Sequence, residues 1–418
     1  MNYDFTKLSA HIKDLSPLKV LVLGCGAVGS LAIEFFAKAG VGEIICIDMG
    51  SLDHDNAAKH SSMIRKEDAD SYKAIACAER ANGIMIAPNG KSYALVANVQ
   101  SLGPRFYEAF DYVVLALDNY AAKEYVNLIW RQVKKDKRPK FLTGGTIEEC
   151  TNVYFLTGDD ICGRCLYDES WLNGDAAKKR TSCTDAAQYR ISEDDLFEEH
   201  APTSQLASVK CAGQMLDYII ASEKGKREID NTMTYHYPYP NGYDVLKLKK
   251  KKDCPDCQLS DPPEVTILEG SMNDTTLGAL KEMILKDLGT NSFSLLINAY
   301  EWAGVVYSQF IVADQCKVCG SPMFVNRHEY SIREGDIVCR TCQEKEWLPA
   351  KGDISELELL TAFTYADHRF DGKTLFGLGY PVGAYLTVMH DGVVRYYALE
   401  SDTYKTYCKE NDRKELKI

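Results

Sequence analysis

The chain contains no run of the ~18 apolar residues that a membrane-spanning helix needs. Its first residues, Met1–Phe5, lack the basic-then-apolar order of a secretory leader. Positive charge is scarce: 48 lysine and arginine residues stand against 60 aspartate and glutamate residues, and the formal net charge is -12. These absences argue against a membrane protein and against a nucleic-acid-binding protein. They predict a cytoplasmic protein.

A disulfide framework is not expected either. The 15 cysteines are an odd number in a chain without a secretory leader, which is not the pattern of a disulfide-bonded domain. Eight of them form four Cys-x-x-Cys pairs, a spacing typical of metal sites. Apolar residues make up 45% and charged residues 26% of the chain, as in ordinary globular proteins. Its 418 residues predict two or three domains.

Short apolar runs alternate with helical stretches through the first part of the chain. We expect strands at residues 18–23, 43–48, 93–99, 112–117 and 140–143, with helices up to about 39, at 73–81 and at 121–134. This alternation predicts an α/β fold with a doubly wound, parallel, Rossmann-like sheet. A polar stretch at 159–202 is expected to cross the surface, and an apolar helix at 204–221 to return to the core.

A composition break at 260–263 (Ser-Asp-Pro-Pro) predicts a domain boundary. The first domain is therefore expected at 1–258 and a smaller α+β domain at 262–418. In the second domain we expect a helix at 276–288 and strands at 264–268, 292–297 and 304–312, with a short element at 356–363. A closing hairpin is expected around residues 390–392.

A glycine motif follows the first expected strand. Gly24, Gly26 and Gly29 form G-x-G-x-x-G between a strand and a helix, where glycines let the backbone turn tightly and approach phosphates. Asp48 ends the second strand and would hydrogen-bond ribose hydroxyls. The motif alone fits dehydrogenases as well as ATP-binding sheets.

The segment at 47–60 resembles the ubiquitin-activating, ThiF and MoeB superfamily of adenylating enzymes. That family carries Asn eight residues after the acidic strand end and an Arg-Gln pair three residues later. Asn56, Lys59 and His60 stand at those offsets. Two further matches come later in the chain. Lys73 is similar to the family's triphosphate lysine, and Asp118 to the aspartate of its Asp-Asn motif, which holds Mg²⁺ near the α-phosphate.

This resemblance implies ATP and Mg²⁺ as reactants of an adenylation. An attack by a carboxylate on the α-phosphate needs cations on the phosphates and a carboxylate for the metal, roles that Lys59, Lys73 and Asp118 can fill. Two positions depart from the family pattern. Lys59 stands in place of an arginine and cannot form the bidentate hydrogen bonds that arginine makes to phosphate. Gly50 stands in place of a second acidic residue.

The Cys-x-x-Cys pairs predict two structural Zn²⁺ sites. Cys316, Cys319, Cys339 and Cys342 leave 19 residues between their two pairs, which is by itself a zinc-ribbon spacing. Cys162, Cys165, Cys254 and Cys257 are separated by 88 residues, and their spacing alone leaves a joint site open. Members of the superfamily repeatedly hold their crossover region in place with two such pairs. The resemblance therefore implies that these four cysteines bind one zinc ion. A redox role is the alternative reading of a Cys-x-x-Cys pair.

Cys183 lies in the polar stretch within Thr181-Ser182-Cys183-Thr184, which is similar to the transthiolation site of ubiquitin-activating enzymes. The basic residues at 178–180 would favour a thiolate nucleophile. An incidental surface cysteine is the alternative. Residues from about 262 resemble, more faintly, the β-grasp domain that recruits conjugating enzymes, here with the zinc ribbon at 316–342 inserted. A dimerisation domain is the alternative there.

The resemblance therefore implies a ubiquitin-activating-type enzyme. It would adenylate the C-terminal carboxylate of a ubiquitin-like protein, form a thioester on Cys183 and pass the modifier to a conjugating enzyme. A single adenylating half also fits a bacterial member with its own modifier. Two alternatives remain: a sulfur-carrier adenylyltransferase without a thioester, and a catalytically weak subunit of a heteromeric enzyme. Members of the superfamily are usually dimers, so a homodimer is expected.

Overall fold

The computed structural model describes residues 14–52, 63–118, 120–147, 150–166, 201–237, 242–259, 261, 264–297, 310–315, 322–328 and 358–408. The chain divides into two compact units. The first contains the strands β1 to β8 and extends to Gln258, and the second contains Leu259–Thr406 together with Gln100–Phe106. Among the described helices, none is long and apolar enough to cross a membrane.

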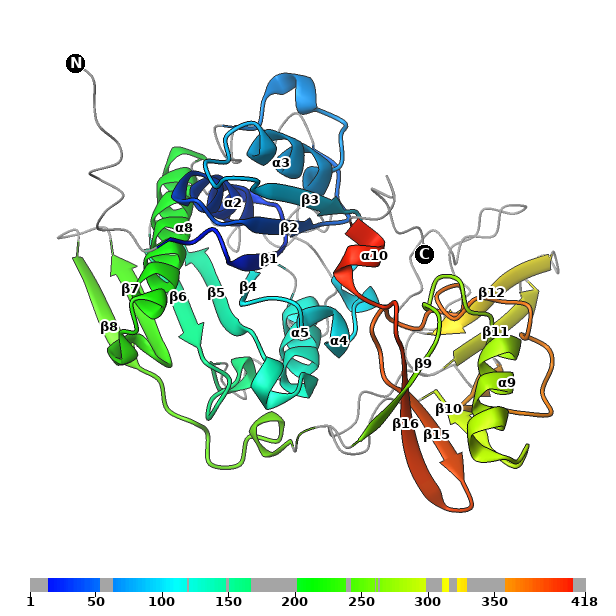
Figure 1. Ribbon diagram of the computed structural model, residues 1–418. Coiled ribbons are helices and arrows are strands. Elements are labelled where there is room, and N and C mark those ends of the chain that lie inside the picture. The colour runs from blue at the N-terminus through cyan, green and yellow to red at the C-terminus, as the bar shows by residue number, and fades with distance from the viewer. Residues whose placement is uncertain are drawn as a thin grey trace, which may run out of the picture. The chain divides into compact units, whose positions relative to one another are not determined.

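An eight-stranded sheet forms the centre of the first unit (Figure 1). Its strands are β1 Lys19–Leu23, β2 Glu43–Ile47, β3 Lys91–Leu95, β4 Tyr112–Leu115, β5 Lys140–Ile147, β6 Cys150–Leu156, β7 Thr232–Tyr237 and β8 Gly242–Lys247. They lie in the order β3-β2-β1-β4-β5-β6-β7-β8. The first five in this order pair in parallel, which confirms the Rossmann-like half. Strands β6, β7 and β8, which the sequence did not predict, pair antiparallel and extend the parallel part, so the complete sheet is mixed.

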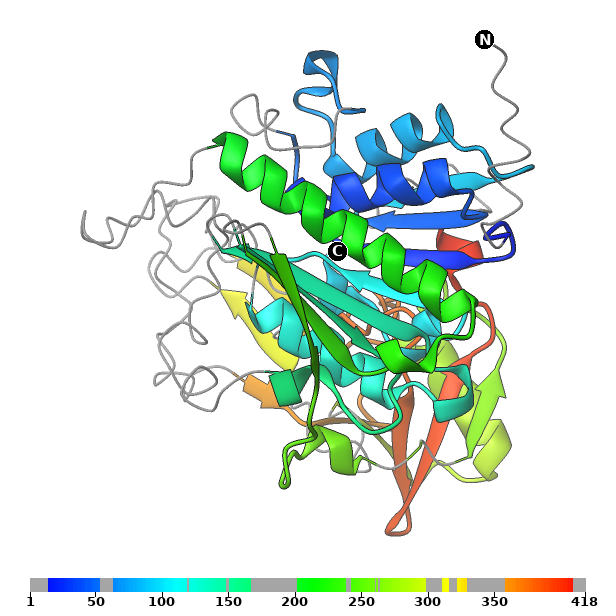
Figure 2. The ribbon, with the colours of Figure 1, turned by 90° about the vertical axis from the view of Figure 1, so that its left-hand side faces the viewer.

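Helices cover both faces of this sheet. The helices α2 Ala27–Ala39, α3 Lys73–Asn82 and α8 Ala201–Glu223 lie on one face, and α5 Tyr120–Gln132 lies on the other (Figures 1 and 2). The short α4 Pro104–Tyr107 precedes β4 in the chain. On the first face, Phe36 of α2 and Met215 of α8 share a buried cluster with Val22. On the second face, Trp130 of α5 packs against Phe141 with ring centroids 4.9 Å apart. Alternate residues of the buried strands therefore serve two cores.

The second unit is built on a five-stranded sheet in the order β14-β10-β15-β16-β9 and a three-stranded sheet in the order β12-β11-β13. Its elements are β9 Val265–Leu268, α9 Leu277–Leu288, β10 Ser294–Leu296, β11 Phe310–Gln315, β12 Pro322–His328, β13 Glu358–Leu360, β14 Ala362–Thr364, β15 Leu386–His390 and β16 Val393–Leu399. Helix α10 Tyr404–Cys408 follows, and its last two residues belong to the first unit. Strands β9 and β16 pair in parallel, and the other pairs are antiparallel.

Local sequence explains several of these elements. Thr276 caps α9 by accepting a hydrogen bond from the Ala279 backbone N–H at 3.2 Å, and Gly289 ends the helix with a φ of 71°. Strands β15 and β16 form the expected hairpin. Its two turn residues, Asp391 and Gly392, have φ of 48° and 74°, as a type I′ turn requires. The β-grasp interpretation of this unit and the inserted ribbon stay predictions.

Candidate nucleotide site and cysteine centre

The predicted nucleotide residues lie at the carboxyl edge of the parallel strands. In the sheet register, Leu23 at the end of β1 pairs with Ile47 of β2 on one side and with Leu115 of β4 on the other. The chain builds β2 and β3 on one side of β1, and β4 and β5 on the other. Such a reversal of strand order opens a crevice at the carboxyl ends, where doubly wound sheets bind ligands. The loops after β1, β2 and β4 therefore form the candidate site.

The glycine loop after β1 leaves room for a ligand at one of its three glycines. Gly24 has a φ of 94°, and a Cβ there would lie 2.5 Å from the Ala116 carbonyl oxygen. A Cβ on Gly29 would lie 1.9 Å from the Gly24 carbonyl oxygen. A Cβ on Gly26 would meet nothing within 4 Å. Gly24 and Gly29 thus close the turn, whereas Gly26 faces open space at the start of α2, where backbone N–H groups favour phosphate.

Asp48 is engaged with two backbone groups of the site. Its Oδ2 accepts a hydrogen bond from the Cys25 N–H and its Oδ1 accepts one from the Gly50 N–H, both at 2.7 Å. A carboxylate has further acceptor capacity, so these bonds are compatible with the ribose contact expected from the sequence. The sequence did not reveal that Asp48 also ties the glycine loop to the loop after β2.

Lys73 is brought to this same loop. It is the first residue of α3, and its backbone N–H donates to the Gly50 carbonyl oxygen at 2.9 Å. A Cβ on Gly50 would lie 3.6 Å from the Lys73 Nζ and 3.1 Å from the Asp48 Oδ1. The ammonium group therefore stands beside the position where the family pattern places a second acidic side chain. With glycine at position 50, the carboxylate that would sit against Lys73 is missing.

Asp118 follows β4 at the same edge and is exposed, two residues before α5 begins at Tyr120. The other predicted residues of this site lie outside the described residues. These are Asn56, Lys59 and the thioester candidate Cys183. The structure thus brings together the glycine loop, Asp48 and Lys73, and it places Asp118 at the end of the neighbouring strand.

Buried thiols in the first unit are poor nucleophiles. Cys25 of the glycine loop, Cys46 of β2 and Cys77 of α3 are fully buried. Hydrogen bonds from Cys46 and Cys77, together with burial, raise the pKa of Cys25. Burial raises the pKa of Cys211 in α8 to about 12. The raised pKa keeps the thiols of Cys25, Cys77 and Cys211 protonated near neutral pH. All four buried cysteines act as packing groups.

Four cysteines from distant parts of the chain meet beside α5. The ligand atoms of Cys162, Cys165, Cys254 and Cys257 all lie within 4.8 Å of one another. The Sγ atoms of Cys165 and Cys257 are 3.4 Å apart, and those of Cys162 and Cys254 are 3.6 Å apart. A tetrahedral Zn²⁺ with bonds of ~2.3 Å to sulfur holds its thiolates ~3.8 Å apart. The cluster therefore fits the structural zinc expected for these two pairs.

The predicted second zinc set lies outside the described residues. It comprises Cys316, Cys319, Cys339 and Cys342. Within the described parts of the chain, the cluster at Cys162 is the single group of three or more His, Cys, Asp or Glu side chains that lie close enough together to hold a metal ion.

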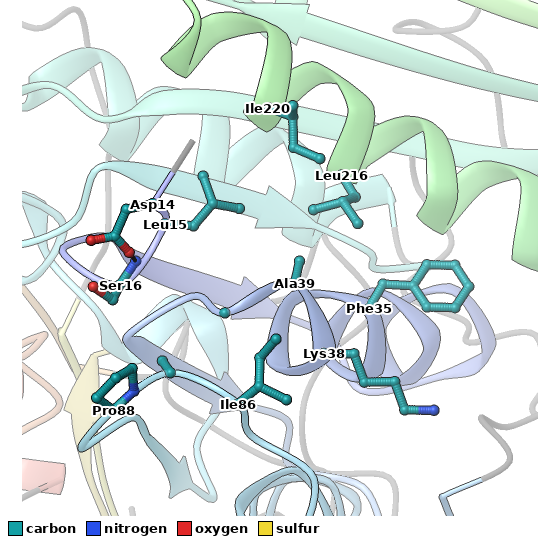
Figure 3. Close-up of a pocket in the computed structure, with 12 residues that line it drawn as sticks. Asp14, Leu15, Ser16, Phe35, Lys38, Ala39, Ile86, Pro88, Leu216 and Ile220 are labelled. Atoms are coloured by element: carbon teal, nitrogen blue, oxygen red, sulfur yellow. Dashed lines mark hydrogen bonds between the residues drawn. The ribbon is translucent and has the colours of Figure 1, made fainter. Parts of the chain in front are cut away.

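A separate cavity of about 640 Å³ lies between α2 and α8. Figure 3 shows Phe35 and Ala39 of α2 facing Leu216 and Ile220 of α8, with Leu15 at the other end. Its lining includes Gly40, the residue that ends α2 before the chain enters β2. The cavity thus lies toward the amino ends of the strands, away from the glycine loop, and it is not the predicted nucleotide site.

The comparison with protein families decides the affiliation of this chain. A family model described as the ThiF family matches residues 4–257. The chain belongs to the ThiF family. The predicted membership in the superfamily of ThiF, MoeB and ubiquitin-activating-type proteins is thereby confirmed.

Curated relatives match a part of this chain. The chain is 26% identical over 130 residues to an Arabidopsis thaliana protein named NEDD8-activating enzyme E1 catalytic subunit, covering 29% of this chain and 27% of that protein. It is 28% identical over 120 residues to a Saccharomyces cerevisiae protein named ubiquitin-activating enzyme E1-like, covering 28% and 18%. A Caenorhabditis elegans SUMO-activating enzyme subunit, uba-2, is 29% identical over 114 residues, covering 26% and 19%. The match thus spans about a quarter or less of the length of these relatives.

Solved structures of Escherichia coli MccB are also similar. One has a TM-score of 0.45 at 16% identity and covers 60% of this chain and 68% of that chain. A structure described as MccB with ATP has a TM-score of 0.43 at 16% identity and covers 58% and 68%. Scores this low do not identify the fold by themselves.

Proposed function

We propose that this ThiF-family chain uses ATP and Mg²⁺ to adenylate the C-terminal carboxylate of a ubiquitin-like protein. The observation that carries the proposal is the meeting of an open glycine loop at Gly26, the carboxylate of Asp48 and the ammonium group of Lys73 at one edge of the sheet. The names of the relatives, which denote activation of NEDD8, ubiquitin and SUMO, support the substrate class.

The proposed chemistry assigns each group a separate task. The open backbone at Gly26 would bind phosphate oxygens at the start of α2, and Asp48 would hold the ribose. Lys73 and Lys59 would neutralise charge on the phosphates, and Asp118 would bind the Mg²⁺. A carboxylate oxygen of the modifier then attacks the α-phosphorus, and pyrophosphate leaves. Asn56 would complete the nucleotide contacts.

An exposed surface at the other end of the sheet supports a protein substrate. Strand β8 is an edge strand, and Tyr243, Val245 and Leu246 are 64%, 53% and 50% exposed. Tyr243 and Val245 lie on one face of the strand, and the Tyr243 ring centroid is 5.7 Å from that of His236 on β7. Exposed apolar groups gathered on one strand are typical of a protein interface. We assign this surface to the folded body of the modifier.

The β8 surface can be tested by single substitutions. Tyr243→Ala should raise the KM for the modifier while the KM for ATP stays the same. Ile86→Ala is the matched control, because Ile86 is 66% exposed in a loop away from β8. Equal KM values for Tyr243→Ala and Ile86→Ala would remove β8 from the substrate site.

Transfer beyond the adenylate is the second part of the proposal. Cys183 would attack the acyl adenylate, release AMP and carry the modifier as a thioester, which stays activated for a conjugating enzyme. The second unit would recruit that enzyme, and the active form would be a homodimer. Cys183→Ala should keep pyrophosphate exchange and lose a thiol-sensitive adduct on a nonreducing gel. Wild-type protein that forms the adenylate but no adduct would instead favour a sulfur-carrier adenylyltransferase.

Exchange between pyrophosphate and ATP tests the adenylation itself. A ubiquitin-like protein with a free C-terminal carboxylate is the class of substrate to try first. Wild-type protein should catalyse exchange only with that protein present, and Asp118→Ala should abolish it by removing a Mg²⁺ ligand. Unchanged exchange in Asp118→Ala would refute the assignment of Asp118. A complete absence of exchange in the wild type would favour a catalytically weak subunit, as the changes at Gly50 and Lys59 suggest.

A further inference from the structure

Helix α5 presents a polar row to the two cysteine loops of the cluster at Cys162. Glu124, Asn127 and Arg131 follow one another at three- and four-residue spacing, which places them on one side of the helix. Asn127 is 2% exposed and Arg131 is 5% exposed. Polar side chains this deeply buried are costly unless they are hydrogen-bonded, so their partners indicate what they hold in place.

Asn127 bonds to both loops at once. Its Oδ1 accepts a hydrogen bond at 2.5 Å from the backbone N–H of Gly163, inside the first Cys-x-x-Cys pair. Its Nδ2 donates at 2.8 Å to the Oδ2 of Asp256, inside the second pair. A primary amide offers an acceptor and donors on one short side chain, which is what this bridge requires. The two loops are joined through a single residue outside both.

The loop residues are suited to this approach. A Cβ on Gly163 would lie 2.7 Å from the Asn127 Oδ1 and 3.0 Å from its Cγ, so glycine lets the amide reach the backbone. Asp256 is 5% exposed, and its carbonyl oxygen accepts a hydrogen bond from the Arg131 Nε at 3.1 Å. Arg164 of the first loop lies 3.7 Å from the Asp256 Oδ1 and 3.5 Å from Glu124. Each loop is thereby fixed to α5 and to the other loop.

We propose that Asn127 is the positioning residue that sets the two cysteine pairs at the spacing of one four-thiolate Zn²⁺ site. Each pair supplies two thiolates, and metal escape requires one loop to move away from the other. A bridge that binds both loops opposes that movement. Groups that orient metal ligands in this way typically change metal affinity ~10–100-fold when they are removed.

The experiment measures how fast the purified full chain releases zinc to an excess of a chelator whose absorbance changes when it binds zinc. Asn127→Ala should release one equivalent of zinc per chain ~10–100-fold faster than the wild type. The second cysteine set, if it holds zinc, should contribute a separate phase that this substitution leaves unchanged. Because the assay contains neither ATP nor a modifier, its outcome is independent of the proposed adenylation.

Asn82→Ala is the matched control. Asn82 lies on α3 in the same unit, and its amide also makes two hydrogen bonds, donating to the Ser92 carbonyl oxygen at 2.9 Å and accepting from the Ser92 N–H at 2.7 Å. This control loses the same kind of side chain without touching the cysteine loops, and its zinc release should match the wild type. Equal release rates for Asn127→Ala and Asn82→Ala would overturn the proposal.

Two further variants separate positioning from general destabilisation. Asn127→Asp keeps the acceptor for Gly163 but sets a second carboxylate against Asp256. Its zinc release should therefore be faster than that of the wild type, like that of Asn127→Ala. Asp256→Ala removes the bridge from the other loop and tests the proposal if Asn127→Ala does not fold.

Cobalt substitution gives a second measurement. The thiolate-to-cobalt charge-transfer band of cobalt-substituted Asn127→Ala should differ from that of the wild type, whereas the band of Asn82→Ala should not. Wild-type release rates and spectra in these variants would contradict the assignment.

Discussion

Gly26 offers a test that separates nucleotide binding from folding. A Cβ at this position meets nothing within 4 Å in the protein, and the residue has ordinary backbone angles, with a φ of -75°. Gly26→Ala should therefore fold with nearly unchanged stability. The new methyl group would occupy the space where phosphates approach the loop. If it costs the complex about 1–3 kcal/mol, as overpacking does, ATP binds roughly 5–150-fold more weakly.

Gly29→Ala should behave in the opposite way. Its Cβ would lie 1.9 Å from the Gly24 carbonyl oxygen, and Gly24 is itself held by a 2.8 Å hydrogen bond from its N–H to the Ile47 carbonyl oxygen. The loop cannot yield without disturbing β1 and β2, so the variant should lose about 1–3 kcal/mol of stability. In a domain of this size that loss lowers the Tm by roughly 2–12 °C.

The Tm measured with and without ATP distinguishes the loss of ATP binding in Gly26→Ala from the loss of stability in Gly29→Ala. Wild-type protein at an ATP concentration of about 100 times the Kd should gain ~2.7 kcal/mol. Gly26→Ala should start from a wild-type Tm and, at the same ATP concentration, lose roughly a third to nine-tenths of the ATP-dependent gain, and Gly29→Ala should start from a lower Tm. Two outcomes would refute the reasoning: a full ATP-dependent gain in Gly26→Ala, or equal stability of Gly26→Ala and Gly29→Ala without ATP.

The remaining predictions concern charge, metal and the C-terminal unit. Lys73→Ala should slow modifier-dependent pyrophosphate exchange by ~10²-fold or more while leaving the Tm unchanged, and an unaffected rate would remove Lys73 from the site. Metal analysis should find two zinc ions per wild-type chain and one in Cys254→Ser, with a lower Tm, because structural zinc contributes folding free energy. Partial burial raises the pKa of Asp371, but hydrogen bonds from Lys281 and His368 outweigh it and hold that pKa below its ordinary value of 3.8. The resulting stability is present above about pH 4 and lost as the pH falls further. Lys281→Met should therefore destabilise the chain at about pH 6 and much less at about pH 3 in urea unfolding; a pH-independent difference would contradict this.

The sequence predicted the parallel half of the sheet because both faces of its strands are buried. Strands β1, β2 and β4 are apolar almost throughout, and the glycine motif marks the turn from β1 into α2. Strand β8 escaped prediction because its residues are exposed on both faces and show no alternation. Strand β6 alternates between buried and half-buried residues, but its sequence, Cys-Thr-Asn-Val-Tyr-Phe-Leu, does not alternate between apolar and polar residues, so periodicity did not predict it either.

The sequence predicted those residues of the candidate site that belong to a recognisable motif. Gly24, Asp48 and Lys73 stand at family spacings, and the structure brings their loops to one edge of the sheet. The meeting of Cys162 with Cys254 depends on the fold, because 88 residues separate the two pairs and spacing alone does not join them. No sequence signal marked Asn127, since a single asparagine in a helix is ordinary until its two partners are seen.

The path of oxygen from the modifier's carboxylate tests the central claim most directly. Wild-type chain is incubated with ATP, Mg²⁺ and a ubiquitin-like protein whose C-terminal carboxylate carries 18O. Attack on the α-phosphorus followed by acyl transfer leaves one carboxylate oxygen on the nucleotide, so mass spectrometry should find AMP with one 18O atom and unlabelled pyrophosphate. Label in inorganic phosphate together with ADP, or turnover that yields only unlabelled AMP, would contradict adenylation of the modifier by this chain.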